Sequence, residues 1–367
     1  MRALALLIAL SPVAAQSSSA ELDMPNGLGA SAPAADAAAR RGLEWLASTQ
    51  TAHGAWIGHV GHKRESSYLV LSSAQDQEQR GEGHLGVTSL AGLAFLAGGH
   101  LPGRGQYGQQ VQRCLDYVID TREDNGYLTD SGSRMYSHAF ATLFLAQVHG
   151  MVRDRRAKDA LEDAVHWIVD CQNRQGGWRY NPFTTQADLS VTVCQLQALR
   201  SARNIGIEVP KATIDRAVEY VLRARTPRGR NTGLFFYKTA GRGALRKNQQ
   251  FAINAAAVTS LFSAGEYDRE VVGPALGFLE SEYDRVAYYY RRHYFYWYGN
   301  YYACQAFFQD GGERFRSYYK KLCRDLVADQ QDDGRWINEV GPGDAFSTAV
   351  ACLLLQVRHQ YLPIFQR

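Results

Sequence analysis

The sequence predicts an all-α protein, a closed (α/α)6 toroid in which six helical hairpins build an inner and an outer ring of helices. Two observations predict this fold. A turn pattern, Gln-x3-Gly-x-Trp, occurs three times, and helical segments with a charged face alternate with almost uncharged ones. Recurrence at a long period is the signature of a repeat architecture, so it decides the fold class before any single residue does.

The three turns share one structural chemistry. Glycine permits a tight turn after a helix, and tryptophan brings a large apolar surface that pins the turn against its neighbours. Tyr127 and Phe235 mark weaker copies of the turn between the strong ones. The glutamine, glycine and tryptophan of the strong copies are Gln50, Gly54 and Trp56; Gln172, Gly176 and Trp178; and Gln330, Gly334 and Trp336.

Two kinds of helix are expected between the turns. The amphipathic kind covers Ala34–Gln50, Tyr107–Thr121, Arg156–Gln172, Lys211–Arg225, Asp268–Tyr283 and Glu313–Gln331. The nearly uncharged kind covers Gly86–Ala97, Tyr136–His149, Asp188–Arg200, Phe251–Ala264, Tyr298–Phe308 and Asp344–Val357. A helix that is apolar all round must be buried on every side, so the uncharged helices are predicted to form the inner ring. An open solenoid would have the same period, but the last repeat is as apolar as the others, which favours closure.

The N-terminal segment predicts export. Residues 1–15 carry an early Arg2, an apolar stretch and a small-residue end, which is typical of a signal peptide cut near Ala15. A buried apolar helix is the alternative. Residues 16–33 are rich in Ser, Ala and Gly and are expected to form a flexible leader, and residues 34–367 a single toroid domain. No later segment has the uninterrupted apolar length that a membrane-spanning helix requires, so we expect a periplasmic or secreted protein.

Charge and cysteine content limit the partners. A net charge of +4 is mild and does not indicate nucleic acid. The stretch from Arg223 to Lys247 is basic and has no acidic residue, so it is either a solvated loop or a site for an anionic partner such as a lipid headgroup. Three of the six cysteines, Cys194, Cys304 and Cys352, lie in Ala- and Leu-rich helical runs, which predicts buried free thiols.

A polar insertion separates the first turn from the next helix. It runs from Ile57 to His84 and contains His59 and His62. Two histidines at this spacing provide half of a metal site, but no regular element nearby supplies the remaining ligands. Histidines in a polar loop are usually solvated. We therefore expect an irregular loop, no metal and no cofactor.

Four segments indicate a family resemblance beyond the turns. They are 176–182 (Gly-Gly-Trp-Arg-Tyr-Asn-Pro), 188–192 (Asp-Leu-Ser-Val-Thr), 297–302 (Trp-Tyr-Gly-Asn-Tyr-Tyr) and 361–365 (Tyr-Leu-Pro-Ile-Phe). With the turns, they resemble an exported bacterial branch of the prenyltransferase and squalene-oxidase repeat family, which is defined by its repeats rather than by a reaction. The resemblance covers almost the whole mature chain. It implies the α/α toroid of terpenoid cyclases and of protein prenyltransferase β subunits.

The reactive motifs of that family are altered in this chain. Residues Asp188–Thr192 resemble the acidic motif of class II terpenoid cyclases, but Ser190 and Val191 stand where the motif has two acids. Asp188 is then expected to be a helix N-cap. The zinc-binding run of protein prenyltransferases is similar to Asp344–Thr348, where Ser347 replaces the histidine. The other two zinc ligands of that family, an aspartate and a cysteine, would fall near Tyr298–Asn300, which contains neither residue type. The resemblance therefore implies the fold without the known reactions.

The remaining candidates lie on the inner helices. If they face the cavity, His138, Asp188 and Asp344 are the candidate general acids or bases, although a lone histidine in an apolar helix is more often a satisfied core residue. The aromatic run from Tyr288 to Tyr302 serves either packing or ligand contact. The candidate ligand-binding residues are Thr88, Thr192, Asn254, Trp297, Asn300, Tyr301 and Ser347.

Three functions remain open at this point. The favoured one is an exported toroid that binds an isoprenoid, peptide or glycan in its cavity or at its rim. The second is an isomerase of the terpenoid-cyclase type with a rearranged acid. The third is polysaccharide processing of the lyase type, which rests on fold analogy alone.

Overall fold

The computed structural model describes residues 31–58, 60–64, 67–70, 83–130, 134–229, 231–239 and 247–365, with the backbone alone for residues 31, 60–64, 67–70 and 247–249. The expected signal peptide and most of the expected leader lie outside the described residues. So do His59 and much of the basic stretch before α9.

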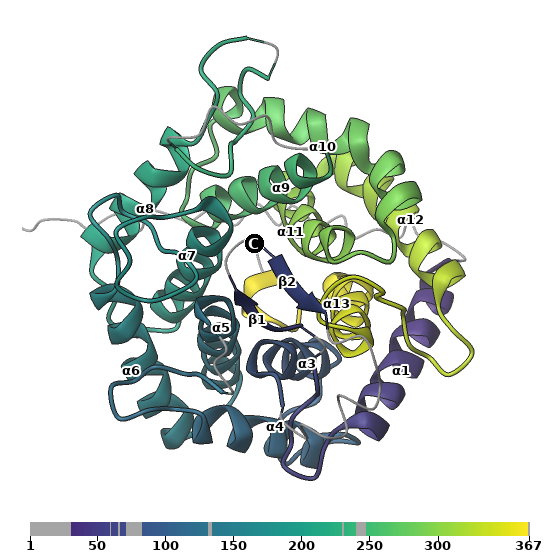
Figure 1. The fold of residues 1–367 in the computed structure, drawn as a ribbon. Coiled ribbons are helices and arrows are strands. Elements are labelled where there is room, and N and C mark those ends of the chain that lie inside the picture. Colours follow the sequence, from purple (N-terminus) through teal and green to yellow (C-terminus); the bar gives the residue numbers. More distant parts are fainter. Residues whose placement is uncertain are drawn as a thin grey trace, which may run out of the picture.

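Two concentric rings of helices make up the fold (Figure 1). The outer ring consists of α1 (Ser31–Thr49), α4 (Gly108–Asp120), α6 (Arg155–Asp170), α8 (Lys211–Arg223), α10 (Arg269–Tyr290) and α12 (Gly312–Asp329). The inner ring consists of α3 (Leu85–Ala97), α5 (Met135–Met151), α7 (Leu189–Asn204), α9 (Lys247–Ser263), α11 (Tyr294–Asp310) and α13 (Asp344–Gln356). Along the described chain the two kinds alternate strictly, which confirms the predicted (α/α)6 toroid.

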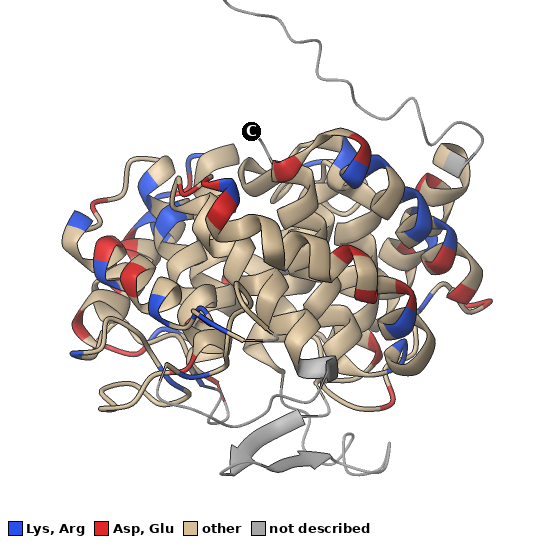
Figure 2. Cartoon of the chain, turned by 90° about the horizontal axis from the view of Figure 1, so that it is seen from above, with Lys and Arg blue, Asp and Glu red and all other residues tan. Residues whose placement is uncertain are grey.

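Hydrophobic patterning assigns each helix to its ring. In α8, Ile214, Ala217 and Val221 are buried, whereas Lys211 and Asp215 are exposed and pair with each other. In α3 every residue is buried. A helix with one apolar stripe fits between core and solvent, whereas a helix without a polar face fits only inside. Figure 2 shows the same division, because the charged residues lie on the outer helices and the connecting segments.

Each strong turn is fixed by its own side chains. Trp178 Nε1 donates to the carbonyl of Ile168 at 2.8 Å, and Gln172 Nε2 donates to the carbonyl of Gly176 at 2.9 Å. Gly176 has a φ of +87°, and a Cβ at this position would overlap the carbonyl oxygen of Arg216 in the next outer helix. Only glycine allows both this dihedral angle and this close approach.

The turn glutamines also close the ring. Gln172 Nε2 donates to the carbonyl of Thr213 in the following outer helix at 2.9 Å. The last turn repeats this contact with the first helix, because Gln330 Nε2 donates to the carbonyl of Ala38 in α1 at 2.8 Å. Arg41 of α1 donates to Gln330 Oε1. The two ends of the repeat array are therefore joined by the same bonds that join neighbouring repeats.

The two ends of the barrel differ. The inner helices are parallel, so all their N-terminal ends lie at one rim. A hairpin of β1 (Val60–Arg64) and β2 (Ser67–Val70) lies within the insertion that leads to α3, where the sequence predicted an irregular loop, and Figure 1 shows it across the middle of the ring. At the other end, the C-terminal segment with η2 (Val357–His359) and η3 (Pro363–Phe365) follows α13, and Ile364 N donates to Gln147 Oε1 near the end of α5.

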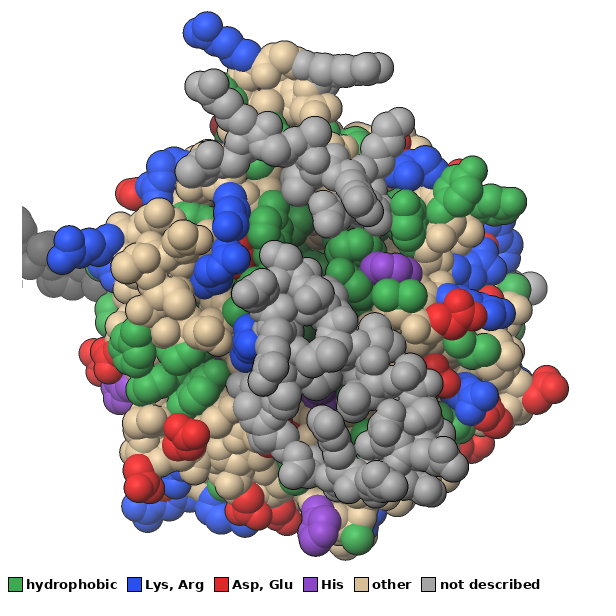
Figure 3. Space-filling model, in the orientation of Figure 1, with side chains coloured by type: hydrophobic (Ala, Val, Ile, Leu, Met, Phe, Trp, Pro, Cys, Tyr) green, Lys and Arg blue, Asp and Glu red, His purple; other side chains and the backbone are tan. Residues whose placement is uncertain are grey.

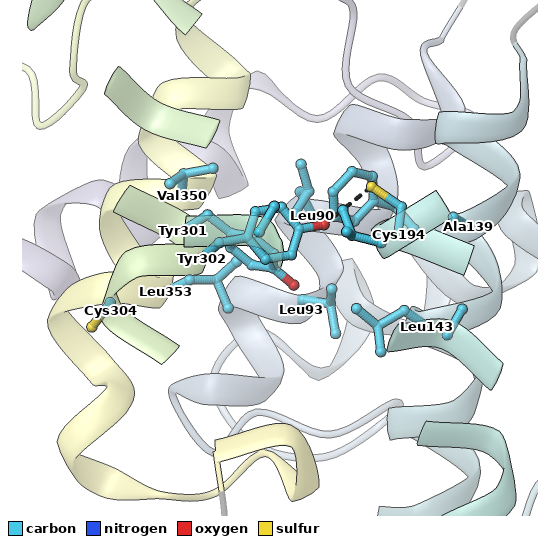
Figure 4. Close-up of a cluster of buried hydrophobic side chains, with 14 of the residues drawn as sticks. Leu90, Leu93, Ala139, Leu143, Cys194, Tyr301, Tyr302, Cys304, Val350 and Leu353 are labelled. Atoms are coloured by element: carbon cyan, nitrogen blue, oxygen red, sulfur yellow. Dashed lines mark hydrogen bonds between the residues drawn. The ribbon is translucent and has the colours of Figure 1, made fainter. Parts of the chain in front are cut away.

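Apolar side chains fill the centre of the barrel. Those labelled in Figure 4 come from five of the inner helices, and none is more than 3% exposed. They are Leu90, Leu93, Ala139, Leu143, Cys194, Tyr301, Tyr302, Cys304, Val350 and Leu353. All six cysteines are free and buried, which confirms the expectation for the thiols. No helix in the described part of the chain is long and apolar enough to cross a membrane.

Candidate functional site: a tyrosine cluster at the barrel rim

Asp188 is the fixed point of the rim. It caps α7, as the sequence predicts, because its Oδ1 accepts a hydrogen bond from Val191 N at 3.0 Å. The same oxygen accepts from Ser190 Oγ at 2.6 Å. The other oxygen, Oδ2, lies 3.7 Å from Arg179 Nη1, and the Asp188 side chain is fully buried. The negative carboxylate is stabilised here by the helix N-terminus and by the guanidinium together.

Four tyrosines surround this aspartate from two inner helices and two connecting segments. Tyr136 of α5 donates to Ser190 Oγ, and Tyr298 of α11 donates to the carbonyl of Ser190 at 3.1 Å. The hydroxyls of Tyr180 and Tyr237, from the α6–α7 and α8–α9 segments, are hydrogen-bonded to each other. We call these four tyrosines, with Asp188 and Ser190, the rim cluster.

The rings of the rim cluster lie against one another. The Tyr136 ring centroid is 5.9 Å from that of Tyr180 and 6.5 Å from that of Tyr298. Arg179 lies over the Tyr180 ring, 5.1 Å from its centroid. Tyr136, Tyr237 and Tyr298 are partly exposed. The rim therefore combines aromatic faces, phenol hydroxyls and one partly buried ion pair, above a barrel that is mainly apolar.

Burial keeps the tyrosine hydroxyls and the Cys194 thiol of this region protonated. It raises the pKa of Tyr136 and of Tyr298 well above the usual value, and neighbouring groups add to the effect. Burial also raises the pKa of the Cys194 thiol to about 12, although Tyr302 donates to its sulfur in the thiolate form. The tyrosines therefore remain hydrogen-bond donors at neutral pH, and Cys194 is not a thiolate nucleophile.

His138 does not join Asp188. Its Nδ1 accepts from Leu128 N at 3.0 Å, and its Nε2 lies 3.2 Å from the carbonyl of Ala164 in the outer helix α6. Both ring nitrogens are thus bound to backbone groups on the outer side of α5. This is the satisfied core histidine that the sequence left open as the alternative to an acid or base.

Like His138, other polar residues near the start of the inner helices bind backbone groups of the turns. In each case an inner-helix side chain accepts the backbone N–H of a turn residue, which fixes the turn to the barrel. The bonds are Trp56 N to Thr88 Oγ1 (2.9 Å), Trp178 N to Thr192 Oγ1 (3.1 Å), Phe235 N to Asn254 Oδ1 (2.9 Å) and Trp336 N to Thr348 Oγ1 (3.1 Å). In the second repeat, the equivalent bond runs from Leu128 N to His138 Nδ1. The turn residue of that repeat is therefore Leu128, and not Tyr127 as the sequence suggested. A polar residue recurring after each turn is the sequence signal for this role.

The other candidates lie in separate contacts. Asp344 accepts from Asn338 N at 2.9 Å and pairs with Arg335 at 3.3 Å. Ser347 donates to the carbonyl of Trp336 at 2.6 Å. Asn300 Oδ1 accepts from the Tyr318 hydroxyl at 2.8 Å. Trp297 and Tyr301 are buried, and Tyr301 lies in the filled centre of the barrel. Of the predicted site residues, the structure therefore places only Asp188 in the rim cluster. Tyr298 lies in the aromatic run that the sequence singled out, but the sequence missed Tyr136, Tyr180 and Tyr237.

Part of the basic stretch is used in local contacts. Arg223 donates to the carbonyl of Gln175 at 2.5 Å, and Arg225 donates to the carbonyl of Glu270. Arg228 is exposed. Among the described residues, no group of three or more His, Cys, Asp or Glu side chains is arranged to hold a metal ion.

The burial of His138 predicts a pH-dependent stability. Burial lowers the pKa of His138 from 6.5 to about 4. The unfolded chain therefore takes up this proton at a higher pH than the folded chain does. The stabilisation is complete above about pH 6.5 and is lost as the pH falls towards 4, by up to about 3 kcal/mol.

Denaturant unfolding of the wild type and of His138→Asn between pH 7 and 4 tests this prediction. Asparagine can accept the Leu128 N–H as Asn254 does for Phe235, but it does not titrate. His100, His293 and His359 also have lowered pKa values and remain in both proteins. A variant that loses as much stability as the wild type over this range would contradict the assignment to His138.

Comparisons with known proteins support the fold. No family model matches the chain. A 115-residue stretch is 27% identical to nezukol synthase of Isodon rubescens, which is 30% of this chain and only 14% of that protein. Cellobiose 2-epimerase from Spirochaeta thermophila superposes with a TM-score of 0.64 at 14% identity, covering 92% of this chain and 98% of the epimerase.

Two glycoside hydrolases are similar to the same extent. An inactive variant of an α-1,6-mannanase from Salegentibacter, in complex with α-1,6-mannotriose, has a TM-score of 0.62 at 8% identity and covers 89% of this chain and 99% of the enzyme. A family 76 mannosidase from Bacteroides thetaiotaomicron has a TM-score of 0.59 at 11% identity, over 89% and 98% of the two chains. At these identities the likeness establishes the fold, and the protein is an α/α toroid. The narrower assignment to squalene cyclases or prenyltransferases has only the short synthase match in its favour.

Proposed function

We propose that the rim cluster binds a glycan. The observation that carries the proposal is the convergence of partly exposed tyrosines around the buried Asp188 and its half-buried partner Arg179. Sugar rings present both apolar C–H faces and hydroxyl groups. Aromatic side chains with a polar tip suit such a surface, because one residue supplies an apolar face and a hydrogen bond. Solved toroids that act on or bind saccharides support this choice by analogy of fold.

An isoprenoid ligand fits the geometry less well. A long hydrocarbon would need an apolar space inside the barrel, and the centre is filled by side chains that are almost completely buried. The polar groups of the rim would also lose their hydrogen bonds to water without gaining partners from a hydrocarbon. For the same reason we favour a glycan over a terpenoid substrate, despite the short match to a terpenoid synthase.

Calorimetric titration with neutral oligosaccharides tests the glycan proposal. The probes are the manno-oligosaccharide series with α-1,6 linkages and the cello-oligosaccharide series. We expect Tyr237→Ala to weaken binding by about tenfold or more, since a ring face and a hydroxyl are lost. Tyr237 lies in a connecting segment, so its removal leaves the helices intact. Tyr289→Ala, an exposed aromatic at the end of α10, is the control. No binding to either series, or equal binding by both variants, would overturn the proposal.

A second candidate is acid–base catalysis at the same site. A chain of hydrogen bonds runs from the hydroxyl of the partly exposed residue Tyr136 to Ser190 Oγ and on to Asp188 Oδ1. In such a chain Tyr136 can take a proton from a substrate, because its own proton passes to Ser190 and the Ser190 proton passes to the Asp188 carboxylate. Product analysis after incubation with the same saccharides tests it. An unchanged product profile for Tyr136→Phe would exclude this role.

We also propose that the chain is exported, from the composition of residues 1–15. Mass spectrometry of the protein from its native host should show an N-terminus just after Ala15. An intact Met1 would contradict export by cleavage.

A further inference from the structure

Phe183 is a bulky residue in a backbone conformation that favours glycine. Its φ is +54°, and its side chain is 61% exposed. A positive φ costs free energy for a side chain with a Cβ, and more so for a bulky one. Because the ring is exposed, its burial offsets little of that free energy. Folding alone therefore does not account for phenylalanine at this position, and such strain is characteristic of functional sites.

The ring of Phe183 is held in place by a second aromatic. It packs edge to face with the ring of Trp167 on α6, with centroids 5.0 Å apart and an interplanar angle of 86°. Trp167 in turn packs against Tyr127 at 5.4 Å. The exposed ring is thus a rigid platform and not a loose side chain.

This platform is continuous with the rim cluster. Phe183 follows Tyr180 by three residues on the α6–α7 segment, so their Cα atoms are at most about 11 Å apart. Figure 3 looks onto this end of the barrel and shows hydrophobic side chains gathered over the α6 side of the ring. A saccharide that binds at Tyr180 and extends outward would meet the Phe183 ring next.

We propose that Phe183, supported by Trp167, forms an outer subsite that stacks on a further sugar unit of the glycan bound at the rim. The inference rests on the proposed glycan function and adds chain-length selectivity to it. A short saccharide reaches only the rim cluster, whereas a longer one also covers the aromatic platform. Replacing the ring should therefore lower the affinity for long saccharides and leave that for short ones unchanged.

The test compares disaccharides and hexasaccharides of the α-1,6-mannan and cello series in calorimetric titrations of the full chain. We expect Phe183→Gly to weaken hexasaccharide binding by about threefold to tenfold and to leave disaccharide binding unchanged. Because glycine accepts the positive φ, the variant should keep or raise the thermal midpoint, which separates a binding role from a structural one. Phe183→Trp keeps a stacking ring and should retain the affinity, and Tyr289→Ala is the surface control.

Each outcome decides between the two proposals. If the wild type binds but Phe183→Gly matches it at both lengths, the outer subsite is overturned while the rim site stands. If Phe183→Gly loses the disaccharide as well and Tyr237→Ala does not, the platform is the primary site, and both proposals are wrong in their present form. If the wild type binds neither series at either length, both are overturned.

Discussion

Replacing Trp178 by alanine is expected to lower the free energy of unfolding by about 3–5 kcal/mol, the range for a fully buried tryptophan. Its side chain is only 2% exposed. It holds the α6–α7 turn from two sides, because Nε1 donates to the carbonyl of Ile168 and its backbone N–H donates to Thr192. Loss of the ring leaves a cavity between the outer helix α6 and the inner helix α7, and the turn loses the bond that ties it to α6.

Urea unfolding followed by far-ultraviolet circular dichroism measures this effect. Tyr288→Ala is the matched control, since it removes an aromatic ring that is 79% exposed and should change stability by no more than about 0.5 kcal/mol. Trp178→Phe should fall between the two. A loss below about 1 kcal/mol for Trp178→Ala would show that the turn tryptophans do not carry the stability of the ring.

The repeat turns explain why the fold could be predicted. Each turn residue has a role that depends on its type alone, as with the positive φ of Gly176 and the buried ring of Trp178. The sequence defines some helix boundaries less sharply. The outer helix expected to end at Tyr283 continues to Tyr290, and the inner helix expected from Tyr298 begins at Tyr294 because His293 caps it. Both differences lie in the aromatic run, where the apolar pattern does not separate one helix from the next.

The rim cluster was only partly predictable, for a geometric reason. Asp188 stands out as a cap before an apolar helix, but Tyr136 and Tyr237, which bond to its partner Ser190, come from other repeats. These side chains come together because three segments, distant in sequence, meet at one end of the barrel. No local sequence pattern encodes that meeting. On an inner helix, moreover, polar residues such as Thr192 and Asn254 are compatible with either a cavity or a turn contact. Burial on all sides removes the polar face that would distinguish the two directions.

Replacing Asp188 by alanine should disrupt both the rim cluster and the start of α7. The variant loses the N-cap bond to Val191 N and the bond from Ser190, and it leaves Arg179 without its buried partner. A cap contributes about 1–2 kcal/mol and a hydrogen bond to a charged group about 1.5–3 kcal/mol, so we expect stability to fall by about 3–5 kcal/mol. Freed from Asp188, Ser190 no longer fixes the Tyr136 hydroxyl, and saccharide binding should be lost with it.

Asp188→Asn separates these two effects. An asparagine side chain still caps a helix, so most of the stability should remain. The negative charge that attracts Arg179 is gone and the bond from Ser190 loses its charged acceptor, so the affinity for saccharides should fall by about tenfold or more. Urea unfolding and calorimetric titration of wild type, Asp188→Ala and Asp188→Asn give both quantities on the same proteins. If Asp188→Asn binds saccharides like the wild type, the buried charge does not organise the rim, and Asp188 is a helix cap alone.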